Sequence, residues 1–255
     1  METTVDTREL EAKVKDMYKH VAEQPEGKYH FEMGRPLAEH LGYPPDVLDR
    51  IPDGAIESFA GVGYFFDLAD LQDGERVVDL GSGSGMDVFF AADRVGSNGS
   101  VVGIDFTVEQ LDKSRRIAAQ DGISQVELRE GRIEDVPVGD AACDCVISNG
   151  VINLAPDKHP VFAEAARVLR RGGRLAIADI VSEKQMSEGI VCDADLWASC
   201  IGGAAQQDAY REAIEAAGLQ IEEIRDNPYR FISDRARNAS DKYGVKSVSL
   251  LAVKA

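Results

Sequence analysis

The sequence lacks the features that mark membrane and exported proteins. No apolar run among its 255 residues approaches the roughly 20 residues that a helix needs to span a bilayer. Residues 1–10 are polar and carry charges of both signs, which does not fit a signal peptide. We therefore expect a cytoplasmic protein with no membrane partner.

Cysteine and histidine are scarce, and their spacing excludes two further classes of protein. The four cysteines are Cys143, Cys145, Cys192 and Cys200, and no pair has the CxxC spacing of a zinc knuckle. The four histidines are scattered along the chain. A chain of this length with four cysteines is not a disulfide scaffold. We expect no structural metal site, and we expect Cys143 and Cys145 to lie in the core.

Basic residues are few relative to acidic ones. Lys and Arg number 28 against 45 Asp and Glu, which gives a formal net charge of -17 and a pI of about 4.6. Phosphate backbones are bound by concentrated positive charge, so this balance argues against a nucleic-acid partner and against an anionic membrane surface. The acidity indicates solubility or origin in a salty cytoplasm, and it carries no information about mechanism.

Residues 1–70 differ in pattern from the rest of the chain. Apolar residues at helical spacing predict an amphipathic helix over 8–23. Glycines and prolines interrupt the following stretch, 25–54, and short helices over 35–41 and 45–50 fit best between them. We expect this segment to form an N-terminal helical cap and not an independent domain.

From about residue 71, predicted strands alternate with predicted helices. The strands fall at 76–80, 100–104, 126–130, 143–148, 174–180, 220–225 and 246–253, and the helices at 85–95, 108–120, 158–169 and 208–217. This alternation indicates an α/β domain over 71–255, built on a parallel sheet with helices on both faces. Sheets of this kind bind ligands at the carboxyl ends of their strands.

The first predicted strand leads directly into a glycine-rich loop, Gly81-Ser82-Gly83-Ser84-Gly85. Glycines allow a tight turn and a close approach of the backbone to a ligand. The helix that follows offers unpaired N–H groups at its N-terminus. We therefore expect the loop to bind a nucleotide-like ligand.

The spacing of this loop separates several ligand classes. A dinucleotide-binding GxGxxG loop would have its third glycine at position 86, which is Met86, and the Gly-Lys-Ser or Gly-Lys-Thr ending of a phosphate-binding loop is missing. No Lys or Arg lies in the loop to meet a pyrophosphate, and Asp79 stands just before it. That acid suits a ligand with an ammonium and a sulfonium group, such as S-adenosylmethionine.

A second acid, Asp105, follows at the carboxyl end of the next predicted strand. A carboxylate at this place accepts hydrogen bonds from both ribose hydroxyls of a nucleoside. Enzymes that bind NAD share this acid, so Asp105 alone does not discriminate. The combination of Asp79 with the early third glycine favours S-adenosylmethionine and argues against an NAD-dependent oxidoreductase.

Four motifs in order resemble those of one enzyme family. Residues 79–85, 103–105, 131–134 and 143–148 are similar to successive motifs of the Rossmann-like S-adenosylmethionine-dependent methyltransferases, and 170–175 resembles their turn before the fifth strand. The resemblance implies a Rossmann-like, seven-stranded, mostly parallel sheet with a final antiparallel strand at 247–253. It also implies S-adenosylmethionine as the cofactor.

The resemblance also implies where the cofactor binds. The family places adenine beside the loop after the third strand, which maps onto Arg132, Ile133 and Glu134. Many members have an acid where this chain has Arg132, so the backbone of Ile133 would contact the adenine instead. The residues expected to bind the cofactor are Asp79, Gly81, Ser82, Gly83, Gly85, Asp105, Phe106, Arg132, Ile133, Glu134 and Asn149.

Within the family, residues 147–154, 197–204 and 41–63 are similar to stretches of arsenite methyltransferases. Those enzymes bind trivalent arsenic through three cysteine thiolates. Cys200 matches one of the three positions, whereas Gly150 and Val62 stand where the other two are. Soft thiolates select a thiophilic ion, and a single thiol gives no chelate. On one continuous helix, Cys192 and Cys200 would lie roughly 12 Å apart along the axis, too far to share one ion.

Two classes of methyl acceptor therefore stay open. The similarity to arsenite enzymes favours arsenite or a related metalloid, bound with the help of Cys200. Gly150 and Val62 favour a small organic O, N, S or C nucleophile, and our interpretation leans to this second class. The residues expected to contact the acceptor are Cys200, Gly150, Asn153, Trp197 and Tyr18.

The expected reaction is an in-line transfer of the methyl group to this small molecule. The segments 1–70 and 182–207 would close over the pocket, and the sequence nominates no general base. A non-catalytic module that only binds S-adenosylmethionine is the alternative. The chain is expected to be a monomer or a homodimer.

Overall fold

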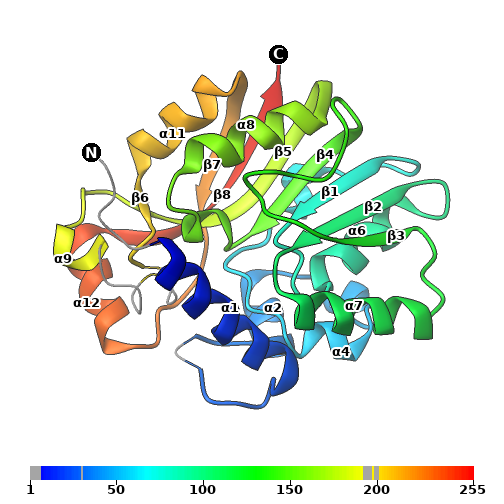
Figure 1. Ribbon diagram of the computed structural model, residues 1–255, viewed down its shortest axis with the longest axis horizontal. Helices are drawn as coiled ribbons and strands as arrows, with labels where there is room; N and C mark the ends of the chain where they lie inside the picture. The colour runs from blue at the N-terminus through cyan, green and yellow to red at the C-terminus, as the bar shows by residue number, and fades with distance from the viewer. Residues whose placement is uncertain (1–6, 30, 192–196, 198–200) are drawn as a thin grey trace.

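The computed structural model of the chain describes residues 7–29, 31–191, 197 and 201–255. Its centre is one sheet with the strand order β3-β2-β1-β4-β5-β8-β7, and the short strand β6 pairs with β5 (Figure 1). The strands are β1 (Arg76–Leu80), β2 (Ser100–Asp105), β3 (Val126–Glu130), β4 (Cys143–Asn149), β5 (Leu169–Ser182), β6 (Ala205–Gln206), β7 (Leu219–Asp226) and β8 (Val245–Lys254).

The sheet is parallel except at β8. This strand runs antiparallel to both β5 and β7, and the other pairs are parallel. The structure therefore confirms the α/β class, the mostly parallel sheet and the final antiparallel strand. The additional strand β6 is only 2 residues long, and such a short pairing leaves no alternating pattern in the sequence.

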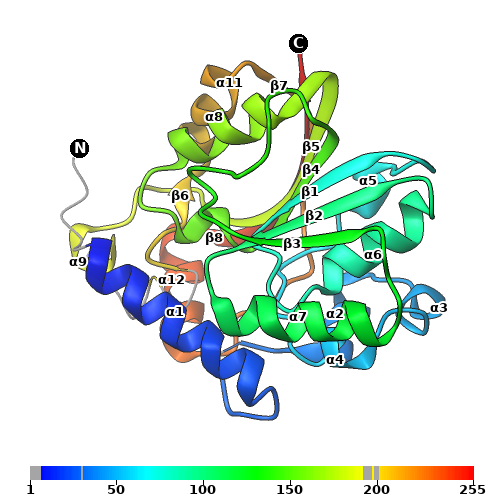
Figure 2. The same ribbon diagram turned by 45° about the vertical axis from the view of Figure 1, so that its right-hand side comes forward.

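Helices cover both faces of the sheet. Figure 2 shows α6 and α7 on one side and α8 and α11 on the other. Val77 and Val78, successive residues of β1, belong to the two separate apolar cores that result. The bounds of these helices are α6 (Met86–Val95), α7 (Val108–Gln120), α8 (Lys158–Val168) and α11 (Gln207–Ala216).

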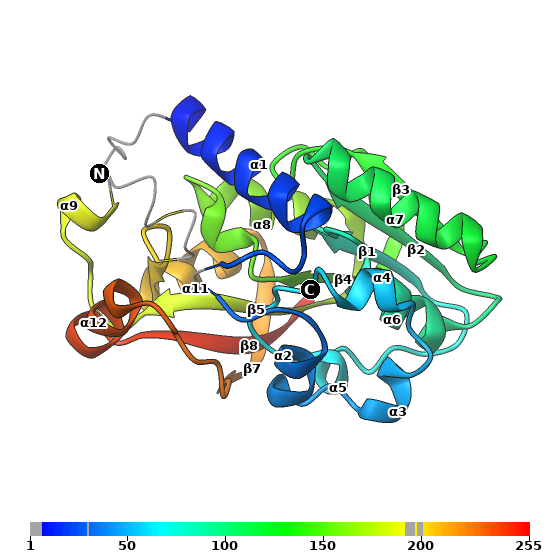
Figure 3. The ribbon, with the colours of Figure 1, turned by 90° about the horizontal axis from the view of Figure 1, so that it is seen from below.

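The N-terminal segment divides into two parts. Helices α2 to α5 bury Leu48 and Phe65 in the same core as Phe90 of α6 and Ala176 of β5. Helix α1 belongs instead to a small separate cluster and lies beside α7 (Figure 3). Residues 34–69 thus form part of a layer on the sheet. These helices are α1 (Thr7–Glu23), α2 (Gly34–Leu41), α3 (Pro45–Leu48), α4 (Asp53–Ile56) and α5 (Phe66–Ala69).

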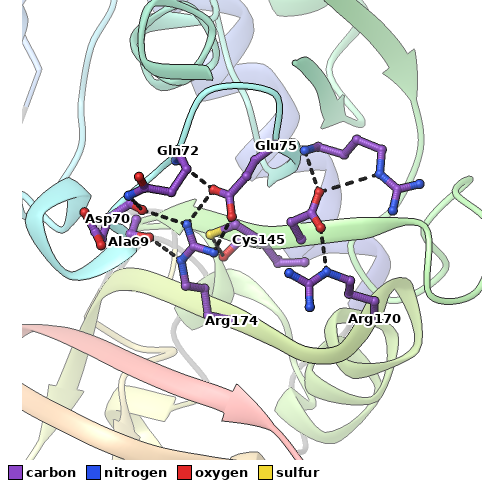
Figure 4. Close-up of polar contacts among 10 residues, drawn as sticks. Ala69, Asp70, Gln72, Glu75, Cys145, Arg170 and Arg174 are labelled. Atoms are coloured by element: carbon purple, nitrogen blue, oxygen red, sulfur yellow. Dashed lines mark hydrogen bonds and ion pairs between the residues drawn. The ribbon is translucent and has the colours of Figure 1, made fainter. Parts of the chain in front are cut away.

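A polar network joins this N-terminal layer to the sheet near the amino ends of the strands (Figure 4). Arg174 of β5 donates to both carboxylate oxygens of Glu75, at 2.8 and 2.6 Å. The same guanidinium donates to the carbonyls of Ala69 and Asp70. Ligands bind at the opposite, carboxyl ends in sheets of this kind, so the network has a structural role.

Three further elements of the structure are short or polar. These are η1 (Ile152–Leu154), α9 (Glu188–Val191) and α12 (Asp234–Tyr243). Helix α12 buries only Ala236, Ala239 and Tyr243, so its sequence carries no clear apolar stripe. Among the described helices, none combines the length and the apolar composition that crossing a membrane requires.

Candidate functional site

The loop between β1 and α6 turns sharply because glycine occupies three of its positions. Gly81, Gly83 and Gly85 have φ angles of 79°, 52° and 97°, in the left-handed region that residues with a Cβ disfavour. The N–H groups of Gly81 and Ser82 both donate to the carbonyl of Ile104, at 2.8 and 2.9 Å. These bonds hold the loop against the carboxyl end of β2.

Asp105, the last residue of β2, orders the same loop with its side chain. Its Oδ2 accepts the N–H of Gly83 at 2.9 Å, and its Oδ1 accepts the N–H of Thr107 at 2.8 Å. Burial raises the pKa of this carboxyl, although both hydrogen bonds favour its charged form. Asp105 also lines a cavity beneath α1, called the main cavity below because most of the predicted cofactor residues line it. The carboxylate that shapes the loop therefore also faces the space for a ligand.

The main cavity is enclosed between the glycine loop and α1. Leu10, Glu11, Val14 and Tyr18 of α1 form one wall of it. The predicted cofactor residues that line this cavity are Gly81, Gly83, Asp105, Phe106, Arg132, Ile133, Glu134 and Asn149. The loops after β1, β2, β3 and β4 are thus brought together, as expected for the carboxyl ends of parallel strands.

A second cavity adjoins the first at Gly81, Gly83 and Asn149, which line both. It contains Asp79 and Ser82, two further residues of the predicted cofactor set. Gly85, the last of that set, lies at the N-terminal end of α6 and lines neither cavity. The candidate site is therefore divided into two compartments that meet at the glycine loop.

Two buried carboxyl groups face the second compartment. Asp79 is 2% exposed, and no hydrogen bond or ion pair to its carboxylate is formed among the described residues. Burial, with the nearby carboxylates of Asp87 and Asp105, holds its pKa well above the usual range. Burial also raises the pKa of Asp87 to about 6, against the lowering effect of hydrogen bonds from Tyr43 and Asn149. A cationic ligand group would relieve this accumulation of negative charge.

The two compartments fit the two halves of S-adenosylmethionine. The unpartnered carboxylate of Asp79 offers a counter-charge to the ammonium of the amino-acid half. Asp105 offers acceptors to ribose hydroxyls in the main cavity. The loop leaves room at Gly83, where an added Cβ would meet only the side-chain oxygen of Gln110, at 3.8 Å.

Asn149, at the end of β4, uses its amide to hold residues 61–63 in place. Its Oδ1 accepts the N–H of Val62 at 2.7 Å, and its Nδ2 donates to the carbonyl of Gly63 at 3.0 Å. The same Nδ2 lies 3.0 Å from Tyr43 Oη and 3.0 Å from Asp87 Oδ2. Asn149 therefore connects the N-terminal layer to the wall shared by the two compartments.

Arg132 is turned toward α1. Its Nη1 contacts Glu11 Oε2 at 2.8 Å, and its Nε lies 3.7 Å from Glu134 Oε2. The ammonium of Lys15, also on α1, lies 5.0 Å from the centre of the Phe106 ring. Charged contacts thus join α1 to the loops after β2 and β3, where several of the predicted cofactor residues lie.

The residues predicted to contact the acceptor fall into four groups. Tyr18 lines the main cavity. Gly150 packs on Val62: a Cβ at position 150 would lie 3.1 Å from Val62 Cγ1. Asn153 and Trp197 are buried and line neither compartment. Cys200, like Cys192, lies outside the described residues.

The sequence motifs did not reveal several residues of the site. Asp87 follows the glycine loop inside an apolar helix, and that isolated buried acid was the one available signal. Tyr43, Glu11 and Leu10 reach the site from distant parts of the chain, which no local pattern records. Cys143 and Cys145 are buried as predicted, and no described group of three or more His, Cys, Asp or Glu side chains could hold a metal ion.

Comparison with solved structures shows the same architecture in other proteins. An arsenic(III) S-adenosylmethionine methyltransferase from Chlamydomonas reinhardtii matches with a TM-score of 0.69 and 28% identity, over 82% of this chain and 72% of that one. A geranyl diphosphate C-methyltransferase from Streptomyces coelicolor A3(2) matches with a TM-score of 0.65 and 20% identity, over 95% and 98%. At that lower identity the second likeness concerns the fold alone.

Sequence comparison finds arsenite methyltransferases among the relatives. The enzyme from Halobacterium salinarum is 41% identical over 199 residues, which are 77% of this chain and 51% of that protein. The human arsenite methyltransferase is 37% identical over 179 residues, 67% of this chain and 46% of the relative. The chain spans about half the length of these curated relatives.

A family model described as "Methyltransferase domain" matches residues 71–218. The matched range contains the glycine loop, Asp105 and the loops after β3 and β4, which line the two compartments together with α1 and residues 55–61 from outside the range. The chain therefore belongs to the S-adenosylmethionine-dependent methyltransferase family and is arsenite methyltransferase-like within it.

Proposed function

We propose that this chain transfers the methyl group of S-adenosylmethionine to a small organic nucleophile held beneath α1. One observation carries the proposal. The buried and unpartnered Asp79 lies beside the glycine loop, in a compartment that adjoins the one lined by Asp105. One ligand would extend across the loop, with its cationic amino-acid end in the compartment of Asp79 and its nucleoside end in the compartment of Asp105.

The residues of the two compartments have separate roles in this proposal. Asp79 binds the ammonium of the cofactor, and Asp105 binds the ribose hydroxyls. Phe106 and the backbone of Ile133 hold the adenine. The bound cofactor supplies a methyl group that is already activated on a sulfonium. Asp87 and Asn149 fix residues 61–63 as the wall between this group and the N-terminal layer.

The protein's main contribution to the transfer is alignment and exclusion of water. Leu10 and Val14 of α1 place apolar surface on one side of the main cavity, and Leu154 does so on another. The carboxylates of Glu11 and Glu134 both face Arg132. We therefore assign no general base to this wall, which suits an acceptor atom that attacks through a lone pair.

Contact between Gly150 and Val62 supports an organic acceptor. Arsenite methyltransferases have thiolates at these two positions, and here the same place presents a methyl-bearing side chain and a glycine. Gly150 has a φ angle of 72°, which itself favours glycine at the turn after β4. Val62 is 1% exposed, and neither Val62 nor Gly150 lines either compartment. These positions offer no thiolate to a thiophilic ion and place only apolar side-chain atoms behind the wall, which suits an uncharged small molecule better.

A thiophilic acceptor is the second candidate, because the curated relatives named above are arsenite methyltransferases. An assay for methylated arsenic, with arsenite and added thiol present, distinguishes the two candidate acceptors. The assay is run under conditions in which calorimetry shows that S-adenosylmethionine is bound. We expect cofactor binding and no methylated arsenic from the natural chain. Formation of methylated arsenic would overturn the organic acceptor. Cofactor binding without turnover over a wide panel of organic nucleophiles would favour a non-catalytic binding module.

A double variant provides the matched comparison. The Cβ positions at 62 and 150 lie 3.8 Å apart, within the range that bridged cysteines occupy. We expect Val62→Cys/Gly150→Cys to bind arsenite at least about tenfold more tightly than the natural chain, since two thiolates at that spacing give a chelate. Each single variant is the control, and an unchanged affinity in the double variant would show that these positions do not select the acceptor.

Other expectations from the sequence stay predictions. These are a cytoplasmic location, the absence of a nucleic-acid partner, and a monomeric or homodimeric state. The direct contacts of the cofactor residues and of Cys200 also stay predictions.

A further inference from the structure

Lys158 is a buried lysine in an unfavourable place. It is the first residue of α8 and is only 8% exposed. The N-terminus of a helix carries partial positive charge, which disfavours a cation, and burial disfavours it further. Both effects oppose an ammonium at this position. A lysine placed at such an energetic cost indicates a role beyond stabilising the fold.

The ammonium holds the turn that follows β4. Its Nζ donates to the carbonyl of Ala155 at 2.6 Å and to the carbonyl of Asn153 at 3.2 Å. Leu154 and Ala155, within this turn, line the main cavity. Lys158 therefore fixes one wall of the cofactor compartment from behind.

The same ammonium also contacts Trp197. It lies 5.0 Å from the centre of the indole ring, at cation–π distance. Trp197 is 2% exposed and packs with Leu10 and Val14, which line the main cavity from α1. A Cβ at Gly203 would collide with both the Trp197 ring and the carbonyl of Asn153, so these parts are in close contact. Lys158 thus lies beside the place where the turn after β4, Trp197 and α1 meet.

A buried acid balances the charge of this cluster. Asp179 of β5 is 1% exposed and accepts the hydroxyl of Tyr210 at 2.6 Å and the N–H of Ile180 at 2.8 Å. Burial raises the pKa of Asp179, while the hydroxyl of Tyr210 and the charge of Lys158 oppose the rise. The cluster therefore connects the sheet, α8 and Trp197.

We propose that Lys158 is a positioning residue for methyl transfer, which couples the occupancy of the cofactor compartment to the placement of Trp197 and α1. This inference rests on the proposed function, because it takes the compartment to hold S-adenosylmethionine. Ligand contact with the turn at Leu154 and Ala155 would be transmitted through the ammonium to the indole ring. The indole ring would in turn hold Leu10 and Val14 of α1, which pack on it, against the main cavity.

The charge of Lys158 depends on its surroundings. Asp179 of β5, Asp157 at the start of α8 and Glu134 after β3 are the charged groups that face it, and Tyr210 of α11 acts through Asp179. Burial lowers the pKa of Lys158 below 10.5, although the three carboxylates oppose this. Above its own pKa the ammonium loses a proton and the contact with the ring weakens. The free energy of unfolding increases over the same pH range, because the folded state releases this proton at a lower pH than the unfolded chain does.

The test uses the fluorescence of Trp197, which is the single tryptophan of the sequence. In the natural chain we expect saturating S-adenosylhomocysteine to change the emission. Lys158→Met should reduce this change at least threefold, and Lys158→Arg should keep most of it. Lys254→Met is the control. Lys254 also donates its ammonium to a backbone carbonyl, that of Leu169 at 2.7 Å, but this contact lies at the amino end of β5 and involves neither α1 nor Trp197, so its loss should leave the emission response intact.

A second measurement requires no ligand, and it does not depend on whether Lys158→Met is fully stable. Between neutral pH and 10.5, the emission of the natural chain should titrate with a midpoint below the ordinary lysine value, and that of Lys158→Arg should not. The proposal fails if Lys158→Arg titrates like the natural chain, or if Lys158→Met responds fully to S-adenosylhomocysteine. If calorimetry shows no binding of S-adenosylhomocysteine to the natural chain, the proposed function is overturned instead. The pH titration of the emission would still test the contact between Lys158 and Trp197.

Discussion

At the scale of single residues, the proposed binding role of Asp79 conflicts with the stability of the fold. Its carboxylate is buried, has no hydrogen-bond partner among the described residues and lies near two other acids. Nothing in the fold requires a charge at this position, and the apolar environment penalises it. We attribute this energetically unfavourable group at a cavity wall to the proposed binding of a cationic ligand.

We expect Asp79→Asn to stabilise the ligand-free protein and to weaken cofactor binding. A raised pKa means that the folded state prefers the protonated acid, so stability is lost as pH rises from 3.8 through the folded value. Near neutral pH the variant should therefore gain about 1–3 kcal/mol in urea unfolding, the scale of a buried polar group without a partner. Below pH 3.8 the gain should vanish.

The same variant should bind S-adenosylmethionine at least about tenfold more weakly by calorimetry, because the ammonium loses a charged acceptor. Asp87→Asn does not serve as an equivalent, since Asp87 accepts hydrogen bonds from Tyr43 and Asn149 and its amide would disturb both. If Asp79→Asn lowered stability at neutral pH, or left the affinity unchanged, the assignment of Asp79 to the cofactor ammonium would be rejected.

At the scale of elements, the joint between the N-terminal layer and the sheet rests on Arg174 (Figure 4). Its guanidinium bonds Glu75 twice, and both side chains are largely shielded from water, at 17% and 15% exposure. Arg174→Ala would leave Glu75 and the carbonyls of Ala69 and Asp70 without these donors. We expect a loss of about 2–4 kcal/mol in unfolding free energy, somewhat below the roughly 3–5 kcal/mol of a fully buried pair because both side chains keep some exposure.

The affinity of this variant for S-adenosylmethionine should stay within about twofold, because the network lies near the amino ends of the strands and the site at the carboxyl ends. Arg170→Ala is the matched control: Arg170 pairs with Asp144 at 2.6 Å but is 45% exposed. Its removal should lower stability by under about 1 kcal/mol. Equal losses from the two variants would contradict a special role for Arg174.

The elements also show which parts of the fold could be predicted from sequence. The central strand β1 is marked by a short apolar run, and the edge strand β3 by the alternation of Val126 and Leu128 with charged residues. Their bounds match the predicted 76–80 and 126–130. Asp79 and Asp105 could be found because loop spacing fixes their place. The contact of Tyr43 with Asp87 could not, since it joins residues that only tertiary structure brings together.

At the scale of the whole molecule, the excess of acidic residues should make stability rise with salt. Acidic residues outnumber basic ones by 45 to 28, so many surface carboxylates have no cationic partner. Their mutual repulsion acts over about 10 Å at 0.1 M salt and about 3 Å at 1 M. Salt also weakens the surface ion pairs, but each of these contributes only about 0–1 kcal/mol. With a net charge of -17, relief of repulsion should prevail.

We therefore expect the thermal midpoint to increase by several degrees between about 0.1 M and 1 M sodium chloride, since about 1 kcal/mol shifts it by roughly 2–4 °C in a domain of this size. An uncharged osmolyte at equal osmolarity is the control for effects of excluded solvent. Calorimetric affinity for S-adenosylmethionine should change less than about threefold over the same range, because Asp79 and Asp105 are buried and screened little. A midpoint that fell with salt would show that the surface ion pairs, and not the net charge, dominate the electrostatic free energy of the fold.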